Sequence, residues 1–163
     1  MTGRITRAVD FERVLKTTSQ ARSPHFAVHH LASTPSGFKN PLFMPVDAQL
    51  STSAAAVPQV AVDELDISHV GETPKRGVWL GMVVPKRHAK RAVTRTLLKR
   101  QIKAAMALLE LQTPAPSGLW VVRLRAPFDR AVYVSAASKA LSAVARDELT
   151  RVLNSAARRL QAA

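Results

Sequence analysis

The strongest constraint on the fold of this chain is a nearly continuous apolar run, VWLGMVV, at residues 78–84. A run of this length is typical of a strand buried on both faces, and Pro85 ends it. A helical pattern follows at residues 91–111, and a second strand pattern, LWVVRLR, follows at residues 119–125. Because amphipathic helices of this length need a sheet to cover, the order strand–helix–strand predicts helices packed on a small sheet.

Three flanking segments complete the expected architecture. They are a short helix at residues 10–17, a strand at residues 25–31 and a long helix at residues 135–160. In the first of these, Phe11, Val14 and Leu15 recur at the spacing that places side chains on one helix face. The resulting order, α-β-β-α-β-α, predicts an α+β fold of the two-layer α/β sandwich type, in a single domain over residues 1–163.

Residues 35–74 interrupt this pattern between the first two expected strands. They are rich in Pro, Ser, Ala and Val, follow no sustained period, and hold five acids against one base, Lys39. This composition predicts a long, partly disordered acidic insertion loop, compatible with one short strand at residues 57–62. Because the loop carries −4 of a formal net charge of +13, the remaining residues carry +17.

Charge and composition bound the functional classes. A chain with 47% hydrophobic residues can bury a core, and one this basic attracts polyanions: nucleic acid first, an anionic membrane surface second. The 163 residues include no cysteine, which excludes disulfides and thiolate metal sites and favours a cytoplasmic location. No run approaches the roughly 20 apolar residues that span a bilayer.

The basic residues concentrate in and just before the helix at residues 91–111. Eight Lys or Arg side chains and no acid occupy residues 83–105. On a helical wheel, Arg95, Lys99 and Lys103 recur every four residues and form one row. The opposite side is the expected apolar face, comprising Val93, Leu97, Leu98, Gln101, Ile102, Ala104, Ala105 and Leu108.

This row of like charges calls for a partner of opposite charge. Like charges four residues apart destabilise a helix by roughly 0.2–0.5 kcal/mol per pair, and ordinary solvated faces alternate acids with bases instead. A purely solvated face therefore fits this row less well than a ladder of phosphates, to which Lys and Arg bind with release of counterions. The candidate RNA-binding residues are Lys86, Arg87, Lys90, Arg91, Arg95, Lys99, Arg100 and Lys103.

The run LGMVVPKRHAKRAVTRTLLKR resembles the signature of the protein subunit of bacterial ribonuclease P, in which a strand and a basic turn precede a helix opening A-V-x-R-N-R-x-K-R. The matching positions are Ala92, Val93, Arg95, Lys99 and Arg100. The chain departs from the pattern at Thr96 and Leu97, where the family usually has Asn and Arg. RITRAVDFERVL, at residues 4–15, and GLWVVRLR, at residues 118–125, are similar to two further family segments.

The resemblance implies that the chain is not itself the catalyst. Proteins of this family assist a large catalytic RNA, which holds Mg²⁺ ions and removes the 5′ leader of precursor tRNA. The basic helix, including the position of Thr96, then contacts the catalytic RNA. A cleft between the first helix and the sheet holds the single-stranded leader, at positions matching Phe11, Leu15 and His29. The resemblance also implies a left-handed crossover between the two apolar strands, where sequence alone favours a right-handed one.

Simpler structural roles compete for several of these residues. Phe11 fits plain core packing as well as stacking on RNA bases. Trp79 and Trp120 lie on apolar strands and are expected in the core. Successive strand residues point to opposite faces, so His29 and His30 are not expected to chelate one metal.

The sequence contains no convincing acid–base dyad, activated nucleophile or metal cluster, so neither catalytic nor metal-binding residues are expected. The acids at positions 63, 64 and 66 fit no oxygen cage and are expected to be solvated.

Two other classes compete with a ribozyme subunit. A ribosomal protein or general RNA chaperone shares the charge and the fold class. A membrane-binding amphipathic helix requires apolar residues on its outer face, so a membrane partner is not expected. A stand-alone nuclease is the least favoured alternative.

Overall fold

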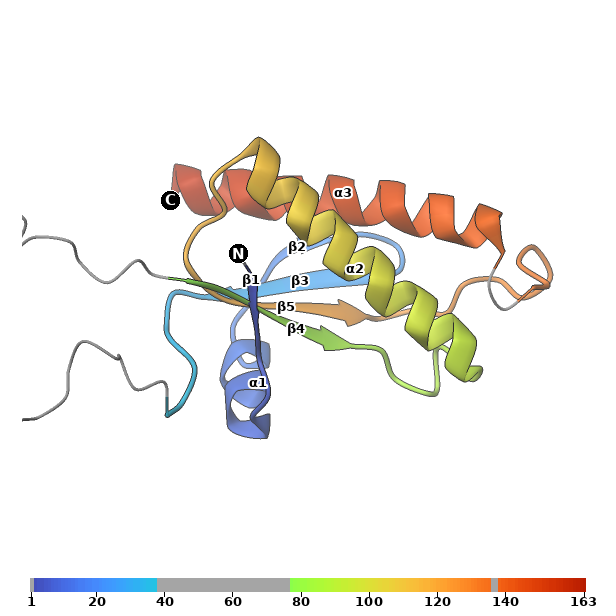
Figure 1. Cartoon of the computed structure of the whole chain (residues 1–163), viewed down its shortest axis with the longest axis horizontal. Coiled ribbons are helices and arrows are strands. Elements are labelled where there is room, and N and C mark those ends of the chain that lie inside the picture. Colours follow the sequence, from blue (N-terminus) through green and yellow to red (C-terminus); the bar gives the residue numbers. More distant parts are fainter. Residues whose placement is uncertain (1, 38–76, 136–137) are drawn as a thin grey trace, which may run out of the picture. The chain divides into compact units, whose positions relative to one another are not determined.

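A computed structural model of the chain describes residues 2–37, 77–135 and 138–163. The chain divides into two compact units, one of Met1–Ser36 and Arg76–Ala163 and the other of Gly37–Lys75. All the helices and strands below belong to the first unit (Figure 1). The predicted insertion loop beyond residue 37, with its short strand and its acids at positions 63, 64 and 66, lies outside the described residues.

Five strands and three helices make up the described part of the first unit. In chain order they are β1 (Thr2–Arg4), α1 (Ala8–Leu15), β2 (Ser19–Arg22), β3 (Phe26–Leu31), β4 (Val78–Val83), α2 (Ala92–Gln112), β5 (Gly118–Leu124) and α3 (Lys139–Ala162). The predicted α+β class is confirmed, and all six expected elements are present. The last helix begins at Lys139 rather than at residue 135, because the Ser138 hydroxyl accepts a hydrogen bond from the Leu141 N–H at 3.0 Å and caps it.

The strands form one sheet in the order β1-β4-β5-β3-β2. β4 and β5 are parallel neighbours joined through α2, whereas β3 runs antiparallel to β5. β5, the last strand along the sequence, therefore occupies the centre of the sheet. The hand of the β4–α2–β5 crossover stays a prediction from the family resemblance.

The edge strands β1 and β2 are the elements that the sequence pattern does not predict. Their sequences, TGR and SQAR, contain no apolar alternation. β1 pairs in parallel with β4, and the Ile5 N–H extends this edge by donating to the Leu80 carbonyl at 3.1 Å. β2 pairs antiparallel with β3. Backbone pairing to a neighbouring strand helps to define both, so their local sequence carries little signal. With β1 and β2 counted, the insertion at residues 35–74 falls between the third and fourth strands rather than between the first two.

Helices α2 and α3 cover one face of the sheet and enclose the larger core (Figure 1). Trp120, Phe26 and Leu98 are fully buried there. The indole N–H of Trp120 donates to the Pro116 carbonyl at 2.9 Å, so the one polar group of this side chain is satisfied. The expectation that Trp120 is a core residue is confirmed.

Helix α1 lies on the opposite face of the sheet and builds a second, smaller core (Figure 1). Its buried members are Ile5, Val14, Leu119 and Val121, and the partly buried side chains around them are Phe11, Leu15, Leu31, Trp79 and Val83. Because α1 has only eight residues, it leaves much of this face partly exposed. We call this side of the sheet the α1 face.

Candidate nucleic-acid interface

The orientation of α2 decides which of its side chains reach solvent. Its buried residues are Leu98, Ile102, Ala105, Met106 and Leu109, which form one stripe against β4 and α3. Leu98, Ile102 and Ala105 were assigned correctly to the apolar face. Val93, Ala104 and Leu108 are exposed, so their assignment to that face was wrong. The reason is that α2 rests mainly on α3, and this contact turns the buried stripe away from the centre of the apolar arc on the wheel.

The predicted RNA-binding side chains remain open to solvent. Lys86, Arg87, Lys90, Arg91, Thr96, Lys99, Arg100 and Lys103 are exposed, and Arg95 is half-buried. We call these nine residues the basic surface. The ion pairs formed between described residues, Arg13–Asp10 and His25–Glu148, lie away from it. Neither of these ion pairs involves the basic surface, and Glu110 is the carboxylate that shares a hollow with one of its members, Lys103.

The turn between β4 and α2 is held by the basic residues themselves. One guanidinium nitrogen of Arg95 donates to the carbonyls of Ala89 and Lys90, at 3.0 and 2.7 Å. The N–H groups of His88 and Ala89 donate to the Pro85 carbonyl, both at 3.1 Å. Arg95 thus orders the turn that presents Lys86, Arg87 and Lys90, in addition to carrying charge.

The basic surface spreads over two sides of α2. Thr96 and Arg100 line a hollow between α2 and the first turn of α3, where Lys139 adds a further cation. Lys103 lines a separate hollow beside β1 and β4, next to Met82. A polyanion that follows α2 therefore finds positive charge on both flanks of the helix.

Phe11, the first predicted leader-binding residue, packs directly on the sheet. A Cβ atom built on Gly81 would lie 2.6 Å from Cε1 of Phe11, so only glycine at position 81 lets the ring rest on β4 at this height. The ring is partly buried against the small core. Phe11 combines the two roles that the sequence left open, since it contributes to the core and keeps part of its surface exposed.

His29 and Leu15 also lie at the α1 face. Nδ1 of His29 lies 3.0 Å from the Thr17 carbonyl, which can only accept a hydrogen bond, so Nδ1 carries the proton and a neutral ring keeps Nε2 as an acceptor. Leu15 is partly buried against the small core. The structure brings Phe11, Leu15 and His29 to one face of the sheet, as the resemblance implied.

Arg123 is a candidate that the sequence analysis missed. It pairs with Ala27 of β3 and Val83 of β4, two residues beyond Val121. Because alternate residues share a face, Arg123 lies on the α1 face with Val121 and His29, and it is half-buried. The available signal was a charged residue in phase with the buried positions of an otherwise apolar strand.

His30, Trp79 and Arg159 have structural roles. His30 is buried in the larger core, where its ring lies 4.9 Å from that of Trp120 and Nε2 lies 3.1 Å from the Ser117 carbonyl. His29 and His30 therefore point to opposite faces, as expected. Trp79 packs against the small core. Arg159 donates to the Gln20 carbonyl at 2.9 Å, which ties α3 to β2.

A buried carboxylate ties the start of α1 to the chain that follows β3. Asp10 is fully buried, and its two oxygens accept from the Ser36 backbone N–H at 2.9 and 3.0 Å. Arg13 donates to Asp10 at 3.2 Å and to the Ser33 hydroxyl at 2.8 Å. Burial raises the pKa of Asp10, but the hydrogen bonds from Ser36 and Arg13 outweigh it and hold the pKa below the ordinary 3.8.

The described residues contain no group of three or more His, Asp or Glu side chains placed to hold a metal ion. No helix within the described ranges has the length and apolarity needed to cross a membrane. An exposed basic helix on one side of the sheet and a half-covered face on the other define the class of small basic α+β proteins whose surface suits a polyanion.

Comparisons with known proteins identify the family within this class. The family model for ribonuclease P matches residues 2–136. The ribonuclease P protein component of Burkholderia pseudomallei (strain 1106a) is 37% identical over 90 residues, which cover 54% of this chain and 63% of the relative. That of Paraburkholderia xenovorans (strain LB400) is 38% identical over 81 residues, which cover 48% and 55%. The chain belongs to the ribonuclease P protein family, and its match spans about 63% of the length of the first of these relatives.

Proposed function

We propose that this chain is the protein subunit of ribonuclease P, and that it assists removal of the 5′ leader from precursor tRNA by a catalytic RNA. Family membership and two relatives named ribonuclease P protein component support this assignment. The observation that carries it is the basic surface itself, in which eight of nine residues are exposed and which takes no part in the Arg13–Asp10 and His25–Glu148 ion pairs.

The basic surface binds the catalytic RNA in this proposal. Lys99, Arg100 and Lys103 point outward from α2 on two flanks, so they can contact phosphates on both sides of the helix. Each phosphate neutralised releases counterions, which stabilises the complex at low salt. Arg95 keeps the preceding turn in place and so positions Lys90.

The α1 face binds the leader in this proposal. Single-stranded RNA is held by flat side chains that stack on bases and by cations that contact the backbone. Phe11 and His29 supply two rings on this face, beside the partly buried Trp79, and Arg123 supplies a cation two residues beyond Val121, the partner of His29. Leu15 gives apolar contact without stacking, because it is aliphatic.

The Mg²⁺ ions are assigned to the RNA subunit. They would stabilise the charge that develops on the scissile phosphate and activate the attacking water. The described residues of the protein offer no carboxylate cluster that fits such an ion. The protein's own part is to bind and orient the two RNA molecules, and the proposed place of action is the cytoplasm.

Reconstitution tests this function. The cognate catalytic RNA, precursor tRNA and wild-type protein are combined at low Mg²⁺, and leader cleavage is compared with that by RNA alone. We expect the protein to increase the cleavage rate, and the protein without RNA to cleave nothing. An unchanged rate across Mg²⁺ concentrations would rule out the proposed function.

A paired substitution tests the role of the basic surface. Lys99→Gln with Lys103→Gln removes two exposed charges and leaves the Arg95 bonds to the turn intact. The variant should bind the catalytic RNA more weakly, with a salt slope shallower by roughly 0.7–0.9 per lost phosphate contact. Retention of wild-type affinity and slope would remove α2 from the interface.

A ribosomal or general RNA-binding role makes a different prediction. Such a protein has no reason to prefer precursor tRNA over mature tRNA, since both present the same folded body. Competition binding in the presence of the catalytic RNA separates the two functions. A preference for the leader-bearing substrate, lost in Phe11→Ala, supports the ribonuclease P role, and equal affinities support the general one.

A further inference from the structure

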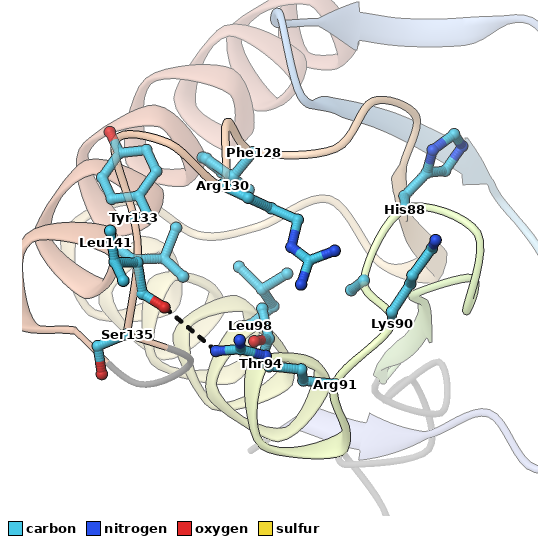
Figure 2. Close-up of a pocket in the computed structure, with 12 residues that line it drawn as sticks. His88, Lys90, Arg91, Thr94, Leu98, Phe128, Arg130, Tyr133, Ser135 and Leu141 are labelled. Atoms are coloured by element: carbon cyan, nitrogen blue, oxygen red, sulfur yellow. Dashed lines mark hydrogen bonds between the residues drawn. The ribbon is translucent and has the colours of Figure 1, made fainter.

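A small cavity lies at the junction of the β4–α2 turn, the first turns of α2 and the segment between β5 and α3 (Figure 2). Lys90 and Arg91 reach it from the turn, and Arg130 reaches it from the β5–α3 segment. Figure 2 shows the Arg130 side chain extending into the cavity from above, toward Arg91 and Thr94. Three cations from two separate segments of the chain therefore converge on one space.

The described lining of the cavity supplies no compensating negative charge. Among the described residues, no Asp or Glu lines it. The nearest acid in sequence, Asp129, accepts a hydrogen bond from the Ala131 N–H at 2.8 Å and is not part of the lining. All three side chains are exposed, so water screens part of their mutual repulsion, and a bound anion would remove more of it.

The cavity walls are joined, so the convergence is built into the fold. A guanidinium nitrogen of Arg91 donates to the Val134 carbonyl at 3.1 Å, which links α2 to the β5–α3 segment (Figure 2). The floor consists of Leu98, Leu141 and Phe128, all of them buried. Because these buried side chains are packed in the core, they hold in place the two segments that carry the cations around the cavity.

The polar lining selects the chemistry of the ligand. The polar side chains around the cavity are those of His88, Lys90, Arg91, Thr94, Arg130, Tyr133 and Ser135. All of these can donate hydrogen bonds, and the described residues of the lining include no carboxylate and no side-chain amide. A nucleobase edge presents both donors and acceptors, whereas a phosphate presents only acceptors. The lining therefore complements a phosphate better than a base.

We propose that this cavity binds a backbone phosphate of RNA, with Arg130 and Lys90 as its main contacts and Arg91 between them. The proposal rests on the proposed RNA-binding function and extends the interface beyond α2 to the β5–α3 segment. It assigns a role to Arg130, which belongs to neither the basic surface nor the α1 face. The RNA then bridges two segments that the Arg91–Val134 bond already holds together.

Charge removal gives the first test. Arg130→Gln should weaken binding of the catalytic RNA and make the salt slope shallower by roughly 0.7–0.9, the value of one phosphate contact. Arg130→Lys should restore the slope, because the charge returns. The matched control is Arg151→Gln, an exposed α3 residue in a different hollow, which should leave the slope at the wild-type value. Equal slopes for Arg130→Gln and wild type would overturn the proposal.

Proximity gives the second test, and the cysteine-free sequence permits it. An iron–EDTA reagent attached at Ser135→Cys, on the cavity rim, generates hydroxyl radicals that cut nearby RNA. We expect cuts in the catalytic RNA at one local site, and their loss when Arg130→Gln is added. Ser155→Cys, exposed in the hollow that contains Arg151, serves as the distant control. Absence of cuts from Ser135→Cys, while Ala92→Cys on α2 gives them, would overturn the proposal.

The two proposals fail in different ways. If the wild-type protein neither binds the catalytic RNA nor assists cleavage, the proposed function fails first. If wild type binds and assists cleavage while Arg130→Gln matches it in affinity and slope, only the cavity proposal fails. Circular dichroism of each variant identifies any loss of folding, and the Arg130→Lys rescue separates charge from side-chain packing.

Discussion

The two faces of the sheet differ in how completely helices cover them. On the α2–α3 face, Phe26, Trp120 and Leu98 are excluded from solvent. On the α1 face, Phe11 of α1 and His29 of β3 keep part of their surface exposed. The first face supplies most of the buried apolar area, so it carries most of the stability.

This difference separates stability from recognition within one small sheet. A fully covered face tolerates no ligand, because any group that enters must displace a packed side chain. A half-covered face offers exposed rings and a cation, and the side chains packed around them hold them in place. We expect substitutions on the first face to change folding and substitutions on the second to change binding.

The largest expected effect follows from truncation in the covered face. Leu98→Ala should lower the free energy of unfolding by about 3 kcal/mol, because it leaves a cavity between α2, α3 and the sheet. Leu111→Ala is the matched control on the same helix, since Leu111 is 83% exposed, and should change it by less than about 0.5 kcal/mol. Urea unfolding measures both, and equal losses would contradict the assigned orientation of α2.

A smaller effect is expected where the half-covered face is anchored. Asp10→Asn replaces a buried acceptor of the Ser36 N–H by a group that also donates, which should cost about 2 kcal/mol. Because α1 then loses its tie to the chain after β3, affinity for the leader should fall more than affinity for the catalytic RNA. Measured losses of equal size for both RNAs would show that Asp10 has no specific influence on the α1 face.

The smallest effect is a pH dependence that distinguishes the two faces. Burial lowers the pKa of His30 below its ordinary 6.5, against the opposing effect of the hydrogen bond to Ser117. The unfolded chain then binds a proton that the folded chain does not, so stability falls as pH drops below about 6.5. Asp10 follows in stronger acid: its pKa is depressed, so its contribution is present above about 3.8 and is lost as pH falls further.

His30→Gln isolates the histidine contribution. The amide of glutamine can still donate to the Ser117 carbonyl, but it does not titrate. Urea unfolding at pH 7.5 and pH 5.5 should show a smaller loss of stability for this variant than for wild type. An identical loss in both proteins would mean that His30 is not the group that responds.

The sequence predicts the elements whose burial is encoded in their own side chains. The apolar run at β4 and the helical spacing of Phe11, Val14 and Leu15 are local signals, and each element is where it was expected. Strands β1 and β2 have no such signal, because pairing with β4 and β3 and, for β2, contact with α3 place them in the sheet.

Prediction of the candidate sites divides in the same way. Charge density identifies the basic surface because it requires no knowledge of distant contacts. The sequence does not predict a role for Arg130, because that role depends on Lys90, which lies 40 positions earlier and lines the same cavity only in the folded chain. For Arg123, the alternation within LWVVRLR shows which residues share its face, but only the register of β5 against β3 and β4 shows which side chains lie beside it.

The central position of β5 has a consequence for synthesis on the ribosome. β5 forms the backbone pairs that join β3 on one side and β4 on the other, yet it leaves the exit tunnel after both of them. Until residue 124 has emerged, the growing chain holds two strand edges without the partner that will separate and cover them. Nascent chains halted before Gly118 should therefore be the species most exposed to aggregation and to chaperone capture.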